Sequence, residues 1–366
     1  MRNSPSFRDD AMTNRKIKVL IVDDSAIARQ VLKEGFSEDP EIEVVGTTPA
    51  PFVARDKIVR LDPDVVTLDV EMDRMDGITF LEKLMASRPT PVVILSALTA
   101  KGCETALRAL ELGAIDVVQK PGLDVSGKLN EMMAPLIETV KAAALAKGKL
   151  SRSARYSPRS LASAVRPLLN TTEKVVALGA STGGTEALRY ILGLLPGNFP
   201  GILIAQHMPE NFTRSFADSL NRICKMEVRE ARHGDTVHTG LALVARGNHH
   251  MVLRRSGTRY FVALNGGPPV CRQRPSVEVL FDSVAEHAGK NAVGVLLTGM
   301  GCDGALGLLR MRQAGAFTIA QDEKSSVVYG MPCEAAKAGA AGKILPLDDI
   351  PRELTDHFSG KPKAFD

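Results

Sequence analysis

The chain has 366 residues, of which 44% are hydrophobic and 24% are charged, and its formal net charge is +4 at pH 7. This length suits two globular domains, and the composition excludes a fibrous or a disordered protein. The small net charge gives no indication of a nucleic-acid partner, and no apolar run approaches the roughly 18 residues that span a bilayer. The 5 cysteines form no C-x-x-C pair, which indicates reduced thiols and a cytoplasmic protein without direct membrane insertion.

The first part of the chain alternates short apolar runs with amphipathic stretches. Residues 1–15 are polar and predict a disordered extension. In the segment that follows, the predicted strands include 17–22, 42–46 and 65–68, and the predicted helices include 25–36 and 54–61. Repeated strand–helix units over residues 16–140 predict a doubly wound, five-stranded parallel sheet, in which ligands gather at the carboxyl ends of the strands.

The second part of the chain repeats this pattern after a change in composition. Residues 141–171 are rich in Ala, Lys, Ser and Arg, which predicts a linker that continues a helix at its start and is flexible in its middle. Beyond it, predicted strands include 175–178, 202–205, 292–297 and 317–320, with a β-rich stretch over 240–264. Residues 172–360 therefore predict a second α/β domain, doubly wound around a mostly parallel sheet.

Polar side chains follow the predicted strands of the first domain: Asp23, Asp24, Asp69, Ser96 and Lys120. Three carboxylates at neighbouring strand ends repel one another unless a hard divalent cation lies among them, and Mg²⁺ is the natural candidate. The Ser96 hydroxyl and the Lys120 ammonium complete the groups needed to form and hold an acyl phosphate on Asp69. Taken singly, each Asp could instead form a turn or cap a helix.

The motifs Val-Leu-Ile-Val-Asp-Asp-Ser, Thr-Leu-Asp-Val-Glu-Met and Gln-Lys-Pro-Gly resemble the flavodoxin-like receiver domain of two-component response regulators. The resemblance implies that Asp69 is the phosphoacceptor and that Mg²⁺ is the cofactor of its phosphorylation. It further implies the following roles: Mg²⁺ ligation by Asp24, Asp69 and the backbone carbonyl of Glu71, support from Asp23, a switch hydroxyl on Ser96, and a phosphoryl contact from Lys120.

Two positions depart from the usual receiver pattern. Asp73 stands where these domains usually have proline, and an added carboxylate near the acceptor is expected to alter metal affinity or phosphoryl lifetime. Val117 stands three residues before Lys120, where an aromatic residue is frequent. An aromatic rotamer switch at that position is thereby excluded.

A second set of reactive residues follows predicted strands of the second domain. Ser181 lies in Gly-Ala-Ser-Thr-Gly-Gly, His207 in Gln-His-Met-Pro, and Asp303 in Gly-Met-Gly-Cys-Asp-Gly. A serine between a strand and a helix exposes its hydroxyl near backbone N–H groups that favour an oxyanion. We expect Ser181 to act as nucleophile, His207 as general base and then acid, and Asp303 as the group that orients the imidazole.

Other interpretations of these residues stay open at this point. The turn over residues 179–184 could bind phosphate, although it matches neither G-x-G-x-x-G nor a P-loop. Asp303 could cap the helix that follows it, and a lone histidine after a strand is often structural. Thiol chemistry at Cys302 has no neighbouring base. Adjacent His249 and His250 point to opposite faces of a strand, which favours a structural role for one of them over a metal site.

The motifs of this second domain, with Pro-Ser-Val-Glu-Val-Leu-Phe, resemble the catalytic domain of the chemotaxis protein-glutamate methylesterases, the CheB family. The resemblance implies hydrolysis of glutamate γ-methyl esters on chemoreceptors to glutamate and methanol, and deamidation of receptor glutamines. Ser181, His207 and Asp303 match the family triad, and the backbone N–H groups of Met300 and Thr182 are implied as the oxyanion hole. Cys302 stands where asparagine is common, and we expect activity to survive this change.

Together, the two resemblances predict a monomeric enzyme that phosphorylation activates. Its implied partners are methylated chemoreceptors as substrate and a sensor histidine kinase of the chemotaxis type as phosphodonor, and ester hydrolysis needs no cofactor. The unphosphorylated receiver is expected to cover the catalytic cleft. One alternative is a non-enzymatic regulator in which the receiver controls a binding module, although no helix-turn-helix or concentrated basic face indicates DNA. Another is a phosphate-binding or nucleotide enzyme built on the turn at residues 179–184.

Overall fold

The computed structural model describes residues 15–72, 77–97, 99–120, 129–148 and 174–359. The extension expected over residues 1–15 lies outside the described residues apart from Arg15, and so does most of the linker expected over 141–171. The domain limits expected at residues 140 and 172 therefore stay a prediction. Among the described residues, no helix combines the length and the apolar character required to cross a membrane.

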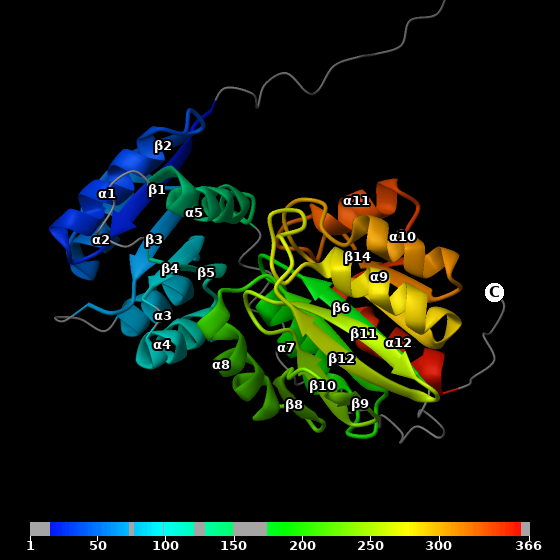
Figure 1. The fold of residues 1–366 in the computed structure, drawn as a ribbon. Coiled ribbons are helices and arrows are strands. Elements are labelled where there is room, and N and C mark those ends of the chain that lie inside the picture. The colour runs from blue at the N-terminus through cyan, green and yellow to red at the C-terminus, as the bar shows by residue number, and fades with distance from the viewer. Residues whose placement is uncertain (1–14, 73–76, 98, 121–128, 149–173, 360–366) are drawn as a thin grey trace, which may run out of the picture.

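The first sheet has five strands in the order β2-β1-β3-β4-β5 and every pairing is parallel, which confirms the predicted doubly wound fold (Figure 1). Its strands are β1 (Ile17–Val22), β2 (Ile42–Thr48), β3 (Val65–Asp69), β4 (Val92–Ser96) and β5 (Asp116–Gln119). Its helices are α1 (Ala26–Ser37), α2 (Pro51–Leu61), α3 (Gly77–Ser87), α4 (Ala100–Glu111) and α5 (Leu129–Ala144). The central strands are buried on both faces, because their near-continuous apolar runs pack against helices on either side.

The second sheet has seven parallel strands in the order β15-β14-β13-β6-β7-β10-β8. These are β6 (Val175–Ala180), β7 (Gly201–Gln206), β8 (Glu227–Glu230), β10 (Leu241–Val244), β13 (Ala292–Leu296), β14 (Phe317–Gln321) and β15 (Lys343–Leu345). The β-rich stretch divides, because β11 (His250–Ser256) and β12 (Arg259–Asn265) join β9 (Thr236–Val237) in a separate antiparallel sheet. The prediction of a mostly parallel α/β domain is confirmed.

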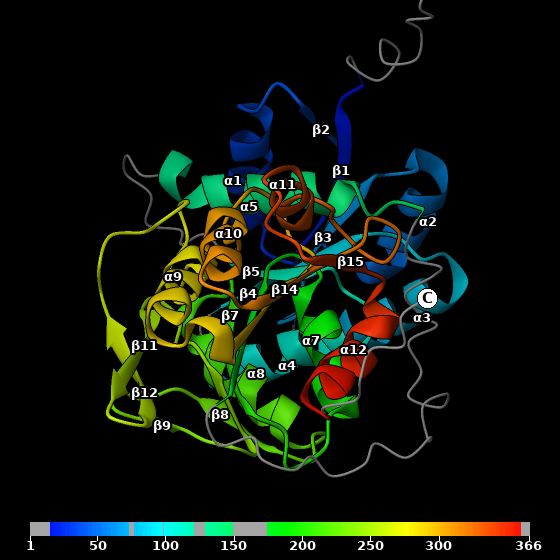
Figure 2. The same ribbon diagram turned by 90° about the vertical axis from the view of Figure 1, so that its right-hand side faces the viewer.

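Helices cover both faces of the second sheet (Figure 2). Buried residues of α9 (Val277–His287), α10 (Ala305–Gln313) and α11 (Met331–Lys337) form one apolar cluster with the sheet. Those of α7 (Gly184–Leu194), α8 (Glu210–Asn221) and α12 (Ile350–Phe358) form the cluster on the other face. This second cluster continues into the receiver, where α4 packs against α7 and α8. The two domains therefore share part of their apolar core.

The order of strands in the second sheet creates a switch point beside β6. From β6 the chain moves to β7 and onward to β10 on one side, and it later returns to β13 on the other side of β6. In doubly wound folds a crevice opens at the carboxyl ends of the strands at such a point. Strands β13, β6 and β7 are adjacent, so the residues that follow them share this crevice.

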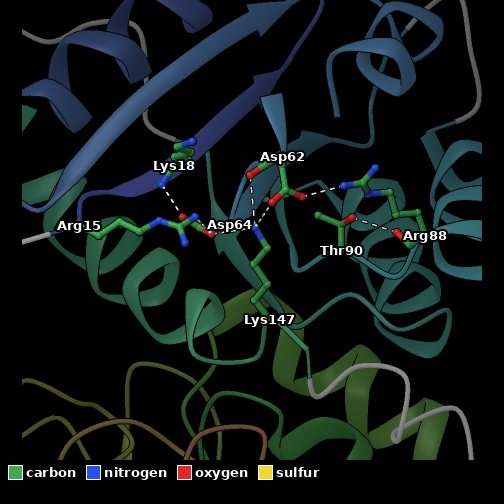
Figure 3. A network of polar contacts seen from close by, with 7 residues as sticks. All are labelled: Arg15, Lys18, Asp62, Asp64, Arg88, Thr90 and Lys147. Carbon is green, nitrogen blue, oxygen red and sulfur yellow. Dashed lines mark hydrogen bonds and ion pairs between the residues drawn. The ribbon is translucent and has the colours of Figure 1, made fainter. Parts of the chain in front are cut away.

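At the amino-terminal ends of the receiver strands, a network of ion pairs holds the segment that follows α5 (Figure 3). Lys147 contacts Asp64 at 2.8 Å and Asp62 at 3.1 Å. Asp64 also accepts a hydrogen bond of 2.9 Å from the backbone N–H of Lys18 and pairs with Arg15 at 3.1 Å. These contacts tie the residues just after α5 to the start of β1 and to the turn before β3.

Candidate active site and phosphorylation site

Ser181 lies at a tight corner between β6 and α7. Its backbone N–H donates to the Thr298 carbonyl at 3.0 Å, and its own carbonyl accepts from the Gly184 N–H at 2.7 Å. Gly183 has φ 76°, and a Cβ there would lie 2.6 Å from the Val327 side chain. Only glycine fits that position. The corner is therefore held rigidly, with the Ser181 side chain at the carboxyl edge of the sheet.

His207 joins the serine to the carboxylate. Its Nδ1 atom lies 3.0 Å from the Ser181 Oγ, and its Nε2 atom lies 2.7 Å from the Asp303 Oδ2. The three residues follow the adjacent strands β6, β7 and β13, which is why residues far apart in sequence meet. An imidazole between a hydroxyl and a carboxylate can take a proton from one side while the other side holds its orientation.

Asp303 is buried, at 2% exposure, and receives several further hydrogen bonds. The Ser276 hydroxyl donates to its Oδ1 at 2.7 Å, and the backbone N–H groups of Val277 and Glu278 donate at 2.7 and 3.0 Å. Burial raises the pKa of Asp303, but the hydrogen bonds from His207, Ser276 and Glu278 outweigh burial and hold the pKa below its usual value. The carboxylate is thus ionised beside the imidazole.

This arrangement decides between two interpretations of Asp303. The helix that follows, α10, has Gly304 at its N-cap and no side-chain cap hydrogen bond. The carboxylate instead lies at the N-terminus of α9, where the backbone N–H groups and the helix dipole favour a negative charge. The hypothesis that Asp303 simply caps α10 is wrong.

Three supporting residues were not predicted as parts of the site. The Ser276 hydroxyl donates to Asp303, and the backbone N–H of Ser276 donates to the Nδ1 atom of buried His250 at 3.2 Å. Gln206 donates through Nε2 to the carbonyls of Ser181 and His207 at 3.0 and 3.1 Å. The signals in sequence were Ser in Pro-Ser-Val-Glu and Gln in Gln-His-Met-Pro, both within motifs that carried the family resemblance. His250 has the structural role that was expected for one of the two adjacent histidines.

The two backbone positions expected in an oxyanion hole flank Ser181. Thr182 follows it directly and is buried, and Met300 is 37% exposed in the loop after β13. A Cβ on Gly299 would lie 2.6 Å from the Ser181 Cβ, so the Met300 loop passes close to the serine. Binding of an oxyanion by these N–H groups stays a prediction.

A cavity of about 680 Å³ lies over the three side chains and is walled by both domains. Ser181, His207 and Asp303 line it from below, together with Thr182 and Cys302. The receiver contributes Asp116, Val117, Val118, Pro135, Glu138 and Thr139. Residues of both domains therefore line the crevice at Ser181, and Val117 lies on the receiver's side of it.

The receiver residues expected around the phosphoacceptor lie together at the carboxyl edge of the first sheet. Carboxylate oxygens of Asp23, Asp24 and Asp69 all lie within 4.8 Å of one another. Lys120 Nζ lies 2.7 Å from Asp23 and 2.6 Å from Asp69. The Ser96 hydroxyl donates to a neighbouring carboxylate at 3.2 Å, that of Glu71. Asp73 lies outside the described residues.

This carboxylate cluster fits a hard divalent cation. Burial raises the pKa of Asp23, and the nearby charge of Asp69 raises it further, against the lowering effect of Lys120. A buried carboxyl that is costly to ionise beside two more carboxylates is the environment that Mg²⁺ relieves through oxygen ligation. The oxygens of Asp24 and Asp69, with the nearby backbone at Glu71, are the ligands of suitable chemistry.

Comparisons with known proteins identify the family of each domain. The family model of CheB methylesterase matches residues 176–354, and that of the response regulator receiver domain matches residues 19–127. The chain is 55% identical over 340 residues to protein-glutamate methylesterase/protein-glutamine glutaminase 2 of Syntrophus aciditrophicus, covering 93% of this chain and 98% of that protein. This chain belongs to the CheB methylesterase family.

Further relatives support the assignment. A protein of the same name from Rhodospirillum rubrum is 54% identical over 355 residues, covering 93% of this chain and 98% of that protein. The crystal structure of the Thermotoga maritima CheB methylesterase catalytic domain has 36% sequence identity and a TM-score of 0.50, and it covers 51% of this chain and 99% of that chain. The chain is accordingly a hydrolase of the CheB family with an amino-terminal response-regulator receiver domain, as the motifs predicted.

Proposed function

We propose that this chain is a protein-glutamate methylesterase, and a protein-glutamine deamidase, whose activity phosphorylation of Asp69 switches on. The observation that carries the proposal is the chain of contacts from the Ser181 Oγ through His207 to Asp303, at 3.0 and 2.7 Å. The substrate is a methylated chemoreceptor, and the products are glutamate and methanol. The same site converts receptor glutamine to glutamate with release of ammonia.

The reaction proceeds in two steps at Ser181. His207 Nδ1 takes the hydroxyl proton as the Ser181 Oγ attacks the ester carbonyl, and the backbone N–H groups of Thr182 and Met300 stabilise the oxyanion. His207 then donates that proton to the departing methanol, leaving an acyl-enzyme. In the second step His207 takes a proton from water as the water oxygen attacks the acyl-enzyme, and it returns this proton to the Ser181 Oγ as the bond to the acyl carbon breaks, which releases the glutamate side chain of the receptor. Throughout, the ionised Asp303 stabilises the imidazolium and holds its orientation, and no cofactor takes part.

The receiver controls access to this reaction. In the unphosphorylated chain, its residues from β5 and α5 wall the cavity over Ser181. A phosphoryl group on Asp69 adds negative charge beside Lys120 and Ser96, and these side chains rearrange to bind it. We propose that this rearrangement weakens the docking of the receiver and shifts the population toward an open enzyme. Bound Mg²⁺, held by Asp24, Asp69 and the Glu71 carbonyl, would neutralise phosphoryl oxygens during transfer.

The partners follow from the two domains. A sensor histidine kinase of the chemotaxis type supplies the phosphoryl group, and the methylated receptor supplies the ester. We propose that the protein works as a monomer in the cytoplasm, where the receptor segments that carry the reacting glutamates are accessible.

Substitution of the nucleophile tests the proposal. The Ser181→Ala variant should release methanol from methylated receptors at least about 10³-fold more slowly than the wild type. Its Asp69 should still accept phosphate from a small-molecule phosphodonor, which shows that the receiver is intact. Substantial methanol release by this variant would exclude Ser181 as nucleophile, and intact phosphorylation with no release by the wild type would favour a non-enzymatic regulator.

A further inference from the structure

An arginine of the catalytic domain holds a carboxylate of the receiver at the rim of the catalytic cavity. Arg272 lines the cavity over Ser181, and its side chain is 84% exposed. Its Nη1 atom lies 2.6 Å from the Oε1 atom of Glu138, on α5 of the receiver. A side chain that both lines the cavity and faces solvent lies where an arriving substrate segment would pass.

The chain presents Arg272 on a tight turn that is held from both ends. Val270 and Gln273 exchange two backbone hydrogen bonds, of 3.1 and 2.9 Å, across the two residues between them. Those two residues, Cys271 and Arg272, have φ of 50° and 63°, which is the left-handed region that favours asparagine and glycine. Such a conformation is costly for other side chains and is often retained where a side chain has a functional position.

The turn is continuous with the residues that support the triad. Two residues beyond the turn's Arg272, Arg274 donates through Nε to the Asn248 Oδ1 at 3.0 Å. Two residues further along, the Ser276 hydroxyl donates to Asp303. An extended chain advances at most about 3.6 Å per residue, so Arg272 and Ser276 lie within about 14 Å of each other. Arg272 is therefore fixed relative to the catalytic residues.

We propose that Arg272 is a docking residue for an acidic side chain of the substrate segment, and that Glu138 of the receiver occupies this position while the enzyme is closed. The inference rests on the methylesterase function proposed above and deepens it by naming a charge that recognises the substrate. The reacting group is an uncharged ester or amide, so an ionic contact must reach another side chain of the same segment. The present occupant is a glutamate on a helix, and the fitting partner is a carboxylate on a helical receptor segment.

The charges on the two walls of the cavity support this exchange. Among the described residues, the receiver wall carries Asp116 and Glu138, whereas the opposite wall carries Arg272 and Arg274 in addition to the triad. The guanidinium of Arg274 is held within its own domain, by Asn248 and by backbone carbonyls. That of Arg272 pairs across the interface, and departure of the receiver would free it for a substrate carboxylate.

The exposure of the pair sets the size of the expected effects. Water and salt screen an ion pair with side chains that are 84% and 45% exposed, so the pair contributes little to the docking of the receiver. A substrate segment that covers the guanidinium excludes water from the contact and strengthens it. Loss of Arg272 should therefore affect substrate binding more than closure.

Kinetics of the full chain, phosphorylated with acetyl phosphate and Mg²⁺, test this role. Arg272→Gly removes the charge and keeps the turn, because glycine adopts a positive φ without strain. Its KM for methanol release from methylated chemoreceptors should rise about fivefold at low ionic strength, with kcat within about twofold of the wild type. Arg272→Lys should recover most of the loss. Arg255→Ala is the matched control, because Arg255 is exposed on β11 and donates to a carbonyl of its own hairpin.

Exchange of the two charges separates substrate binding from closure. The double variant Arg272→Glu/Glu138→Arg can form the pair between domains again, but its catalytic domain presents the wrong charge to an acidic segment. Closure is measured in the unphosphorylated chain by the rate at which a fluorophosphonate, a reagent for activated serines, labels Ser181. Each single variant should label about threefold faster than the wild type, and the double variant at about the wild-type rate.

The KM of the phosphorylated variants then decides the matter. It should rise roughly tenfold in the double variant and stay at the wild-type value in Glu138→Arg alone. A wild-type KM in Arg272→Gly or in the double variant would overturn the inference, because Arg272 would then serve closure alone. A lower kcat with an unchanged KM would overturn it as well. In these cases the wild type still releases methanol and the proposed function stands, whereas no release by the phosphorylated wild type would refute both.

Discussion

The Ser276 hydroxyl donates a hydrogen bond of 2.7 Å to the Asp303 Oδ1, while the other oxygen of the same carboxylate contacts His207. Ser276 is also the N-cap of α9, where its hydroxyl accepts from the Val279 N–H. One side chain thus links the orientation of the carboxylate to the start of a helix. The helix in turn presents two further N–H groups to Asp303.

Ser276→Ala should lower both stability and activity. The substitution removes a buried hydrogen bond to a charged group and the side-chain cap of α9, which predicts a loss of about 1–3 kcal/mol in the free energy of unfolding. Chemical denaturation and the turnover number for methanol release measure the two effects. Ser276→Thr retains the hydroxyl and should recover most of both. A variant with unchanged turnover would show that this contact does not orient Asp303.

Asp303→Asn should lower the rate of methanol release by roughly 10⁴-fold, because the amide cannot stabilise the imidazolium and favours the wrong tautomer of His207. The variant should still fold, since an amide retains part of the hydrogen bonding at the site. Asp282→Asn is a suitable control, because Asp282 lies on α9 and pairs with Arg310 away from the triad. A loss of less than tenfold in Asp303→Asn would contradict the role proposed for this carboxylate.

Asp69→Asn should hold the enzyme at its unphosphorylated rate even with acetyl phosphate present. The amide cannot form the acyl phosphate, and it also removes a carboxylate from the contact with Lys120. Methanol release with and without phosphodonor is the measurement, and Asp56→Asn, on the exposed face of α2, serves as the control. Stimulation of Asp69→Asn to the wild-type level would rule out Asp69 as the switch.

Removal of Mg²⁺ should separate the two activities of the chain. Chelation by EDTA leaves Asp23, Asp24 and Asp69 without a cation and should abolish phosphorylation of Asp69 by acetyl phosphate. The unphosphorylated rate of methanol release should not change, because the residues at Ser181 need no metal. Loss of this basal rate on chelation, with recovery on adding Mg²⁺, would contradict the proposal that Mg²⁺ serves phosphorylation of Asp69 and not ester hydrolysis at Ser181.

Much of this fold followed from local pattern. The buried strands, from Val19–Val22 to Val293–Leu296, are apolar runs of a length typical of parallel strands, and the reactive residues follow them directly. Parallel strands bring their carboxyl ends to one edge, so Ser181, His207 and Asp303 were expected to share a crevice. The separate antiparallel sheet was not predicted, because β-rich sequence does not reveal which strands pair.

The parts that sequence did not provide depend on contacts between distant segments. Nothing local to Asp116 shows that it enters the catalytic cavity, since that position depends on how two domains dock. Ser276 likewise became part of the site only when α9 packed beside the loop after β13. Sequence patterns predict helices, strands and the residues that follow each strand. Contacts between side chains of distant segments depend on how those helices and strands pack together.

The most direct test of the account is methanol release by the full chain from methylated chemoreceptors, measured with and without acetyl phosphate and Mg²⁺. The account predicts slow release by the unphosphorylated enzyme and clearly faster release once Asp69 is phosphorylated, because the receiver then leaves the cavity over Ser181. Release that is absent in both conditions, or that is equally fast in both, would contradict it.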